Sequence, residues 1–424
     1  MKLTINFFFQ KVKTIKQSGE CTKLLYEWLT FFRAGHIAIK RLETKDSIFA
    51  NKVAKPNNNW EVVPIPISEF EKYLNTKKEV DYEGIWETDP YKIGIKKAGQ
   101  SYVGFIIETT ADNWKQGEVK LKFDDKKGTL FLRDKSAESF ETIKALGKNH
   151  LQLGRFSLKR IYPKYDTEKS IETYFKLISA EKPYIEEINA TTLLLRIPSF
   201  GGSQKKDIDN VILANKLKIL KTENLIIDLR NNGGGSDWSY KEIIPFLYTN
   251  PIREVGVAML STKLNNQRML DFINKPEYGL DEETKKWAKT SYDTLEKHLG
   301  SFVNLDSTKV SIQKSDTIYT YPKNVGIIIH KGNGSTTEQF LLAARQSKKV
   351  KLFGTTTFGV LDISNMNFVK SPCNEFELGY SLSKSFRIPN MTIDSKGIQP
   401  DYFLDNEIEE YNWLDYVTKI LNQK

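Results

Sequence analysis

Short hydrophobic runs that end at glycines dominate the C-terminal half of the chain. One run, from Leu225 to Leu229, leads into the three glycines Gly233–Gly235 and then into a stretch with apolar residues on one helical face. A second run ends at His330 and leads into a glycine-containing loop and a helical pattern that begins at Ser335. Both stretches predict a buried strand that is followed by a turn and a helix.

The N-terminal half has a different pattern. Residues 1–55 predict a helical segment that carries a loop with His36, and residues 56–80 predict a linker, beginning in Lys55–Asn59, and a short helix from Ser68. Residues 81–170 alternate between apolar and polar positions with frequent turn residues, which predicts a β-rich insert. The core of the protein is then expected to cover residues 181–424, with a charged helix at 281–299 and a last helix near 411–421.

Five aromatic residues of the insert leave two interpretations open. They could line a groove for a peptide, or they could form the core of the insert, which is the commoner role of aromatic residues in strands. These residues are Trp86, Tyr91, Tyr102, Phe105 and Trp114.

Composition narrows the class of protein. The chain has 424 residues, a hydrophobic content of 39% and a formal charge of +10, which is typical of a globular protein with two or three domains. Its lysines are spread along the whole chain instead of forming a basic stripe, so we expect no nucleic-acid partner. Cys21 and Cys373 cannot form a disulfide framework or a metal-binding motif, and no apolar stretch is long enough to span a membrane.

The glycine-rich turn predicts a site for an oxyanion. Three glycines place no Cβ atoms in the way of a bound oxygen, so backbone N–H groups can approach it. The spacing GxGxxG is absent, and no Lys-Ser/Thr pair follows the glycines, which argues against dinucleotide and phosphate sites. Ser335, with Glu338 three residues later, fits a capping box. The same position at a helix N-terminus also suits a nucleophilic serine.

Three segments together resemble one family. The segments LIIDLRNNGGG, GNGSTTEQFLLAARQSKKVKLFGTTTFG and DSKGIQPD are similar to the core blocks of the tail-specific, or C-terminal processing, serine peptidases, and the likeness runs from about Thr191 to Phe403. The resemblance implies a crotonase-like α/β peptidase core with Ser335 as nucleophile. It also implies an oxyanion hole made by backbone N–H groups near Gly233, Gly234 and Thr336.

The general base distinguishes two branches of this family. One branch carries a lysine where this chain has Val360, and a valine cannot accept a proton. The tricorn-like branch uses a histidine and an acidic residue, and the matching positions here are His36 and Asp394, although Ala34 and Ile37 depart from the pattern around the histidine. The resemblance therefore implies a Ser335–His36–Asp394 triad. Asp362 competes with Asp394 for the acidic role, whereas Asp228 is expected to brace the turn.

Chemistry also favours a histidine as the base, because a serine hydroxyl needs a base that titrates near neutral pH. The chain has four histidines. His330, at the end of the second apolar run, is the rival of His36. His298 is expected to be a solvated surface residue, and His150 carries no motif.

The resulting hypothesis is a serine peptidase that hydrolyses polypeptides without a metal or cofactor. The first alternative is a catalytically inactive pseudo-peptidase that binds peptides, and the second is a crotonase-fold enzyme acting on thioesters. Many relatives carry a PDZ domain, but the insert has no PDZ signature. Relatives are commonly exported, which suggests an extracytoplasmic location. The N-terminal apolar run is short for a signal peptide, and only thirty-five residues precede His36, so we expect a shortened N-terminus.

Overall fold

The chain divides into two compact units. The computed structural model describes residues 7–8, 10–13, 18–31, 35–42, 60–154, 156–276, 280–372, 374–404 and 407–423. The larger unit comprises Met1–Ile48 and Lys176–Lys424, and the β-rich unit comprises Phe49–Phe175. The larger unit is therefore built from both ends of the chain. The predicted linker Lys55–Asn59 and Cys373 lie outside the described residues.

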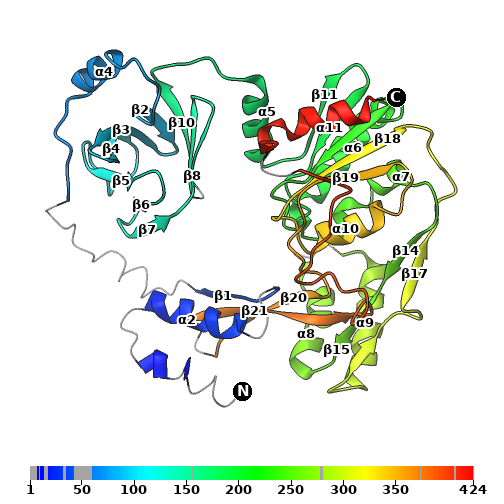
Figure 1. Ribbon diagram of the computed structural model, residues 1–424. Coiled ribbons are helices and arrows are strands. Elements are labelled where there is room, and N and C mark those ends of the chain that lie inside the picture. The colour runs from blue at the N-terminus through cyan, green and yellow to red at the C-terminus, as the bar shows by residue number, and fades with distance from the viewer. Residues whose placement is uncertain are drawn as a thin grey trace. The chain divides into compact units, whose positions relative to one another are not determined.

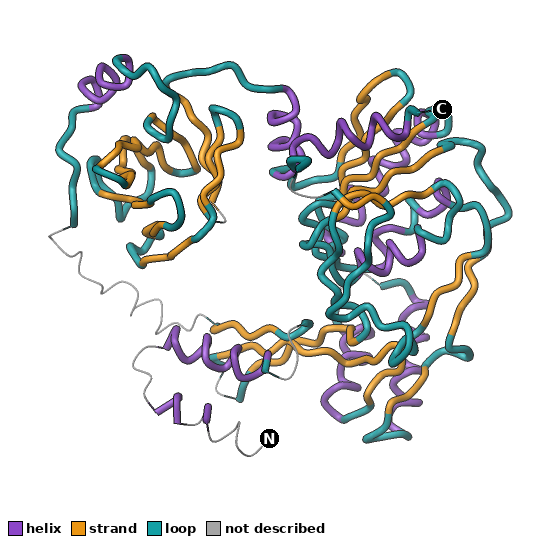
Figure 2. The backbone as a smooth tube through the Cα atoms, in the orientation of Figure 1, coloured by secondary structure: helices purple, strands orange, loops and turns teal. Residues whose placement is uncertain are grey.

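The β-rich unit is a nine-stranded antiparallel sheet with the order β7-β6-β5-β4-β3-β2-β10-β9-β8 (Figure 2, orange). Most neighbours in the sheet are also neighbours in sequence, so short turns connect them. A helix, α4 (Ile67–Asn75), precedes the strands. The strands are β2 (Gly84–Thr88), β3 (Tyr91–Ala98), β4 (Ser101–Thr109), β5 (Val119–Phe123), β6 (Gly128–Phe131), β7 (Ala137–Phe140), β8 (Ile143–Leu146), β9 (His150–Leu153) and β10 (Phe156–Tyr162).

The aromatic residues of this unit are mainly core residues. Trp86, Tyr102, Phe105 and Trp114 are all buried, which favours the core interpretation for these four. Tyr91 is partly buried and lines a cavity instead.

The larger unit contains a six-stranded sheet with the order β11-β12-β13-β18-β19-β22. The strands from β12 to β22 are parallel, and β11 pairs antiparallel at one edge. Their bounds are β11 (Tyr184–Asn189), β12 (Thr192–Arg196), β13 (Asn224–Asp228), β18 (Asn324–Ile329), β19 (Val350–Gly354) and β22 (Tyr402–Phe403).

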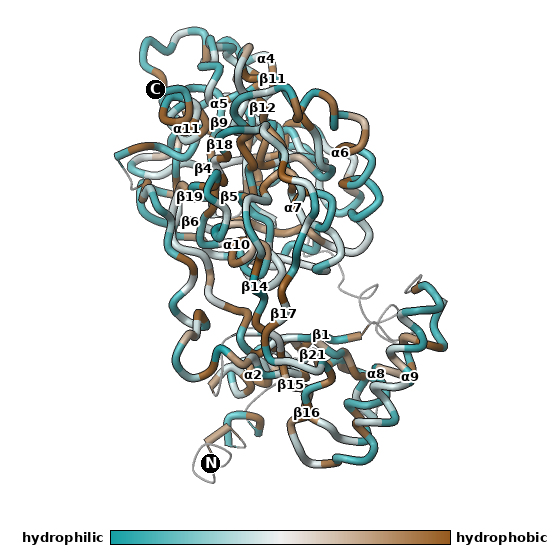
Figure 3. The backbone as a smooth tube through the Cα atoms, turned by 90° about the vertical axis from the view of Figure 1, so that its right-hand side faces the viewer, coloured by the Kyte–Doolittle hydropathy of each residue, from teal (hydrophilic) through white to brown (hydrophobic). Residues whose placement is uncertain are grey.

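Apolar side chains cover both faces of this sheet. Leu225 and Ile227 face one core cluster, whereas Ile226 faces another, as the twofold alternation of a strand requires. Helices α6, α7 and α10 contribute to the first cluster, and α11 with the end of α5 contributes to the second (Figure 1). The helices are α5 (Lys169–Ile178), α6 (Lys205–Ile219), α7 (Ile244–Leu247), α10 (Thr336–Ala344) and α11 (Trp413–Leu421). In Figure 3, β12 is largely brown and α6 shows both teal and brown segments.

A second sheet of the larger unit joins the two ends of the chain. Its order is β1-β21-β15-β16, and β20 also pairs with β21. Ala38 of β1 is paired with Gly379 of β21, so the segment after His36 is held against the C-terminal half. The strands are β1 (Ala38–Arg41), β15 (Val257–Leu260), β16 (Phe302–Asn304), β20 (Ile363–Lys370) and β21 (Phe376–Ser385). The remaining elements are helices α2 (Ser18–Thr30), α8 (Lys263–Asn274) and α9 (Glu282–Glu296), and the two-stranded sheet of β14 (Ile252–Val255) and β17 (Val310–Gln313).

The main predicted elements are present. The two apolar runs form β13 and β18, the charged stretch at 281–299 forms α9, and the last helix is α11, which confirms a mixed α/β fold. Among the described residues, no helix has both the length and the apolar character needed to cross a membrane.

Candidate functional site

Two loops meet at one edge of the six-stranded sheet. Strands β13 and β18 are parallel neighbours, with Asp228 paired with Ile328. The glycine-rich turn follows β13, and the loop that carries Ser335 follows β18. The carboxyl ends of adjacent parallel strands lie at the same edge, so these two loops are neighbours in space. Binding sites of α/β proteins commonly form there.

Two buried asparagines tie the loops together. The side chain of Asn333 donates to the carbonyl oxygens of Leu229, at 2.6 Å, and of Asn232, at 3.0 Å. The side chain of Asn232 accepts the hydroxyl of Thr337 at 2.9 Å. Both asparagines are fully buried, so each hydrogen bond is made away from water and fixes the loop geometry. Sequence analysis missed both residues, although each stands inside a recognised block, in RNNGGG and GNGS.

Gly234 lies directly against the nucleophile loop. A Cβ atom at this position would lie 2.9 Å from Ser335 Cβ and 3.0 Å from the Thr336 nitrogen, and the φ angle of Gly234 is +110°. Glycine is therefore required for both space and backbone conformation.

The N–H groups of the predicted oxyanion site differ in their hydrogen bonding. The N–H of Gly234, one of the predicted oxyanion donors, donates to Asn232 Oδ1 at 3.1 Å. The acceptor lies two residues earlier in the same turn, so this hydrogen bond is local to the glycine-rich turn. Within the described part of the chain, we find no hydrogen bond from the N–H of Gly233 or from that of Thr336.

Ser335 has a strained backbone at the start of α10. Its φ angle is 54° and its ψ angle is −124°, an unusual conformation for a residue with a side chain. Its N–H donates to the carbonyl oxygen of Val360 at 3.0 Å. A strained serine in a sharp strand-to-helix turn is the geometry of known nucleophile elbows.

The predicted capping box is absent. The side chain of Ser335 makes no cap hydrogen bond. Glu338 is fully buried and accepts hydrogen bonds from the Thr357 hydroxyl at 2.5 Å, the Gly359 N–H at 2.7 Å and the Val360 N–H at 2.8 Å. Burial raises the pKa of Glu338, and these three donors oppose that shift. Glu338 therefore braces the loop of residues 357–360 and leaves the Ser335 hydroxyl to other partners.

His36 is anchored in the C-terminal half of the larger unit. Its Nδ1 lies 2.6 Å from the carbonyl oxygen of Ile363, a residue 327 positions away in sequence. A carbonyl only accepts hydrogen bonds, so Nδ1 carries a hydrogen, and in the neutral form of the ring Nε2 is the nitrogen with the lone pair. The Ser381 hydroxyl donates to the His36 carbonyl oxygen at 3.3 Å. His36 also has a positive φ angle, 52°, which again marks a constrained position.

Asp394 and Asp362 form a reciprocal pair of backbone braces. Asp394 Oδ1 accepts the N–H groups of Leu361, at 2.6 Å, and of Asp362, at 2.7 Å. Asp362 Oδ2 in turn accepts the N–H of Asp394 at 2.8 Å, and Asp362 Oδ1 pairs with Arg387 at 2.8 Å. Asp362 is fully buried in this network, so it serves as a structural brace.

The three predicted triad residues all bond to one short segment, residues 360–363. Ser335 bonds to Val360, Asp394 to Leu361 and Asp362, and His36 to Ile363. Three residue steps of extended chain span at most about 11 Å. The fold therefore gathers Ser335, His36 and Asp394 around one segment, although they come from distant parts of the sequence.

Comparison with known proteins identifies the family. The model of Peptidase family S41 matches residues 191–404, about half of the chain, and this range contains both loops and Asp394. The chain belongs to peptidase family S41. It is thus a member of a family of serine-type peptidases, which includes C-terminal processing proteases.

One curated relative of this S41 chain is named "Probable CtpA-like serine protease" and comes from Staphylococcus haemolyticus. It is 28% identical over 169 residues, which cover 36% of this chain and 30% of the relative. The similarity thus spans less than a third of that protein's length.

One solved structure shows a similar fold at low sequence identity. A mutant of CPAF has a TM-score of 0.51 at 14% identity, and the match covers 99% of this chain and 90% of that one. The tricorn protease has a TM-score of 0.31 at 12% identity, with 77% and 22% covered. This second value is too low to assign the S41 chain to a tricorn-like branch.

The other histidines have different surroundings. His330 Nδ1 accepts the Gly332 N–H at 2.8 Å, and its Nε2 lies 2.8 Å from Asn231 Oδ1. Both ring nitrogens are therefore engaged by the loops, and burial lowers the pKa of His330. These contacts suit a brace better than a base. His298 is exposed, as predicted, and His150 lies in the β-rich unit.

Buried ion pairs fix the start of the glycine-rich turn, directly after β13. Asp228 lies 2.6 Å from Arg230 and 3.3 Å from Arg196, and all three side chains are buried. This confirms the predicted bracing role of Asp228. Throughout the described ranges, no group of three or more histidine, cysteine, aspartate or glutamate residues could hold a metal ion.

Proposed function

We propose that this S41 chain is a serine peptidase that hydrolyses peptide bonds of polypeptides, with a crotonase-like core. In this proposal Ser335 Oγ attacks the scissile carbonyl carbon and His36 Nε2 takes the hydroxyl proton. The imidazolium later gives the proton to the leaving amine. The observation that supports it best is the convergence of Ser335, His36 and Asp394 on residues 360–363.

Asp394 acts as the acidic partner in this proposal. Its carboxylate holds the segment whose last carbonyl, that of Ile363, receives the Nδ1–H of His36. It fixes the tautomer of His36 through this carbonyl, and its negative charge favours the imidazolium formed during the reaction.

The N–H groups of Gly233 and Thr336 are the proposed oxyanion donors. Gly233 is exposed, and a Cβ atom there would meet its nearest neighbour only at 4.0 Å, which leaves room for a substrate oxygen. Thr336 is the first residue of α10, so the helix dipole also favours negative charge beside its N–H.

The direct test is cleavage of an unfolded polypeptide, followed by mass spectrometry. Ser335→Ala should reduce the rate by at least roughly 10³-fold, because the nucleophile acts as a unit with its base. Ser315→Ala, at an exposed serine, should cleave at the native rate. If the native protein binds the polypeptide but leaves it intact, the pseudo-peptidase is the better description. If the protein hydrolyses thioesters but not polypeptides, the alternative of a crotonase-fold enzyme acting on thioesters is the better description.

A further inference from the structure

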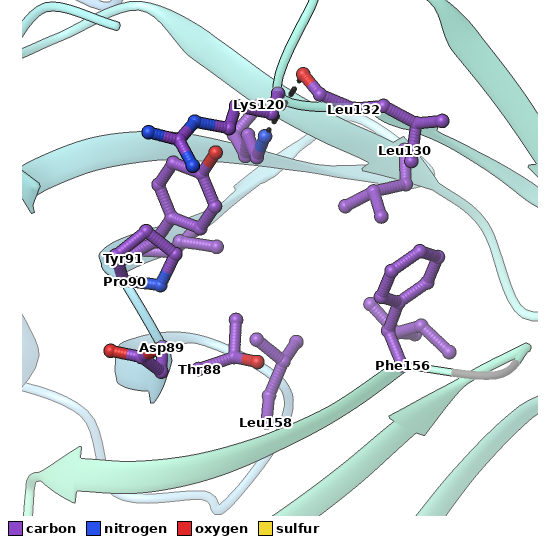
Figure 4. A pocket seen from close by; sticks show the side chains of 12 residues that line it. Thr88, Asp89, Pro90, Tyr91, Lys120, Leu130, Leu132, Phe156 and Leu158 are labelled. Carbon is purple, nitrogen blue, oxygen red and sulfur yellow. Dashed lines mark hydrogen bonds between the residues drawn. The ribbon is translucent and has the colours of Figure 1, made fainter. Parts of the chain in front are cut away.

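The β-rich unit contains a cavity that the proposed peptidase mechanism does not use. It has a volume of about 180 Å³. Most of its wall is apolar, formed by side chains such as Ile93, Leu130, Leu153 and Leu158. In Figure 4, Leu130 and Phe156 lie on one side of the cavity and Tyr91 on the other, with Lys120 above and Leu158 below.

Lys120 is a buried cation at this cavity. Only 3% of its surface is exposed, and its Nζ donates one hydrogen bond, to the Leu132 carbonyl oxygen at 3.3 Å. The ammonium also lies 4.0 Å from the ring centre of Tyr91 and 4.1 Å from that of Trp114. Among the described residues, the contacts of this ammonium are one carbonyl oxygen and two aromatic ring faces, with no ion pair, so it can still donate a hydrogen bond to an added oxygen.

The Tyr91 hydroxyl is a polar group at this cavity without a hydrogen-bond partner among the described residues. It is buried, and within the described residues it makes no hydrogen bond. Tyr91 and Lys120 both line the cavity, so two hydrogen-bond donors lie at one wall of an otherwise apolar space. A buried polar group without a partner is costly, which suggests that something else supplies the acceptor.

We propose that this cavity binds a small carboxylate whose body is one aromatic ring or one branched alkyl group. The carboxylate oxygens accept hydrogen bonds from Lys120 Nζ and the Tyr91 hydroxyl, and the apolar body packs against Leu130, Phe156 and Leu158. The volume fits this class of ligand, because a dry cavity of roughly 150 Å³ already holds a benzene molecule.

Charge at the cavity is consistent with an anionic ligand. Burial lowers the pKa of Lys120 to about 8, so the ammonium is still mainly charged at neutral pH. The Asp134 carboxylate favours the charged form from beyond ion-pair distance. Asp89 and Arg133 are exposed residues of the lining, where solvent screens their charges. The buried ammonium therefore determines which sign of ligand charge is preferred.

Calorimetric titration of the full chain with 3-phenylpropionate tests the proposal. We expect saturable binding, and we expect 3-phenylpropanamide, which has the same shape without the charge, to bind at least about tenfold more weakly. Lys120→Met should weaken binding of the acid by a similar factor. The matched control is Lys122→Met, on the same strand but paired with Glu61 at the surface, which should bind as the native chain does.

A second set of probes distinguishes two sources of the ligand. An acetylated tetrapeptide that ends in phenylalanine carries the same chemistry at the end of a polypeptide. If it binds at least as tightly as 3-phenylpropionate, a polypeptide end is the source, and tighter binding of 3-phenylpropionate indicates a free acid. Either result supports the proposal, provided that Lys120→Met weakens binding of the probe. The proposal fails if none of the probes binds, or if Lys120→Met and native protein bind equally while the variant keeps its native urea midpoint.

Discussion

The polar groups at the candidate site of the larger unit and two buried groups of the β-rich unit differ in how many hydrogen-bond partners they have. In the larger unit Asp228 is paired with Arg196 and Arg230, and Glu338 accepts three hydrogen bonds. In the β-rich unit Lys120 is buried without a carboxylate partner, and the Nδ1 atom of buried His150 has no hydrogen-bond partner among the described residues. Polar groups whose hydrogen bonds are all made hold their loops in one geometry, as a catalytic site requires. Polar groups with an unused donor or acceptor can still bind a ligand or a proton.

The largest expected effect comes from breaking the buried ion pairs of the larger unit. Asp228→Ala leaves two arginines buried without their carboxylate and should lower the free energy of unfolding by about 3–5 kcal/mol. Urea unfolding followed by fluorescence measures it. Asp293→Ala removes an exposed partner of Lys289 on α9 and should change the urea midpoint very little. Equal effects of the two substitutions would contradict the importance of the buried network.

The second effect tests the close contact between the two loops. In Gly234→Ala the new methyl group would meet Ser335 Cβ at 2.9 Å, so the nucleophile must move. A displacement of about 1 Å should slow polypeptide cleavage roughly 10²-fold. Gly202→Ala is the matched control, because a Cβ atom there meets nothing within 4 Å. If Gly234→Ala cleaves at the native rate while folding normally, the loops need not touch for activity.

The smallest effect concerns the unsatisfied histidine of the β-rich unit. His150 stacks on Phe175, with ring centres 3.8 Å apart, and burial lowers its pKa to about 4. As the pH falls, the unfolded chain therefore takes up the proton first, and stability is lost between about pH 6.5 and pH 4. From pH 7 to pH 5 the loss should be roughly 2 kcal/mol.

Urea-dependent hydrogen exchange of β9 and β10 in the full chain, corrected for intrinsic exchange rates, measures this loss. His150→Phe should remove most of the pH dependence, because the phenyl ring keeps the stack and cannot take up a proton. The same loss of stability in His150→Phe would show that another group is responsible.

Local patterns predicted much of the fold. Apolar runs that end at glycines gave β13 and β18, and alternation with turn residues predicted the strands of the β-rich unit. The capping box was wrong, because Glu338 bonds to Thr357, Gly359 and Val360 in a distant loop. A short-range pattern contains no information about such a partner.

The contacts of His36 also could not be predicted from short-range sequence patterns. Strand β1 has only four residues, and its pairing with β21 joins the two ends of the chain. Periodicity cannot reveal this pairing, nor that the Nδ1 of His36 contacts the Ile363 carbonyl oxygen. The resemblance to the peptidase family pointed to His36, whereas residues alone left His330 open. The contacts of His330 with Gly332 and Asn231 depend on loop packing that the sequence does not display.

The central claim is that His36 activates Ser335, and the rate at which a fluorophosphonate modifies the full chain measures this most directly. Mass spectrometry should find one adduct, on Ser335, in the native protein. His36→Ala should slow its formation by roughly 10³-fold or more, and His298→Ala, at an exposed histidine, should leave the rate unchanged. Modification of His36→Ala at the native rate, or an adduct on a residue other than Ser335, would contradict the account.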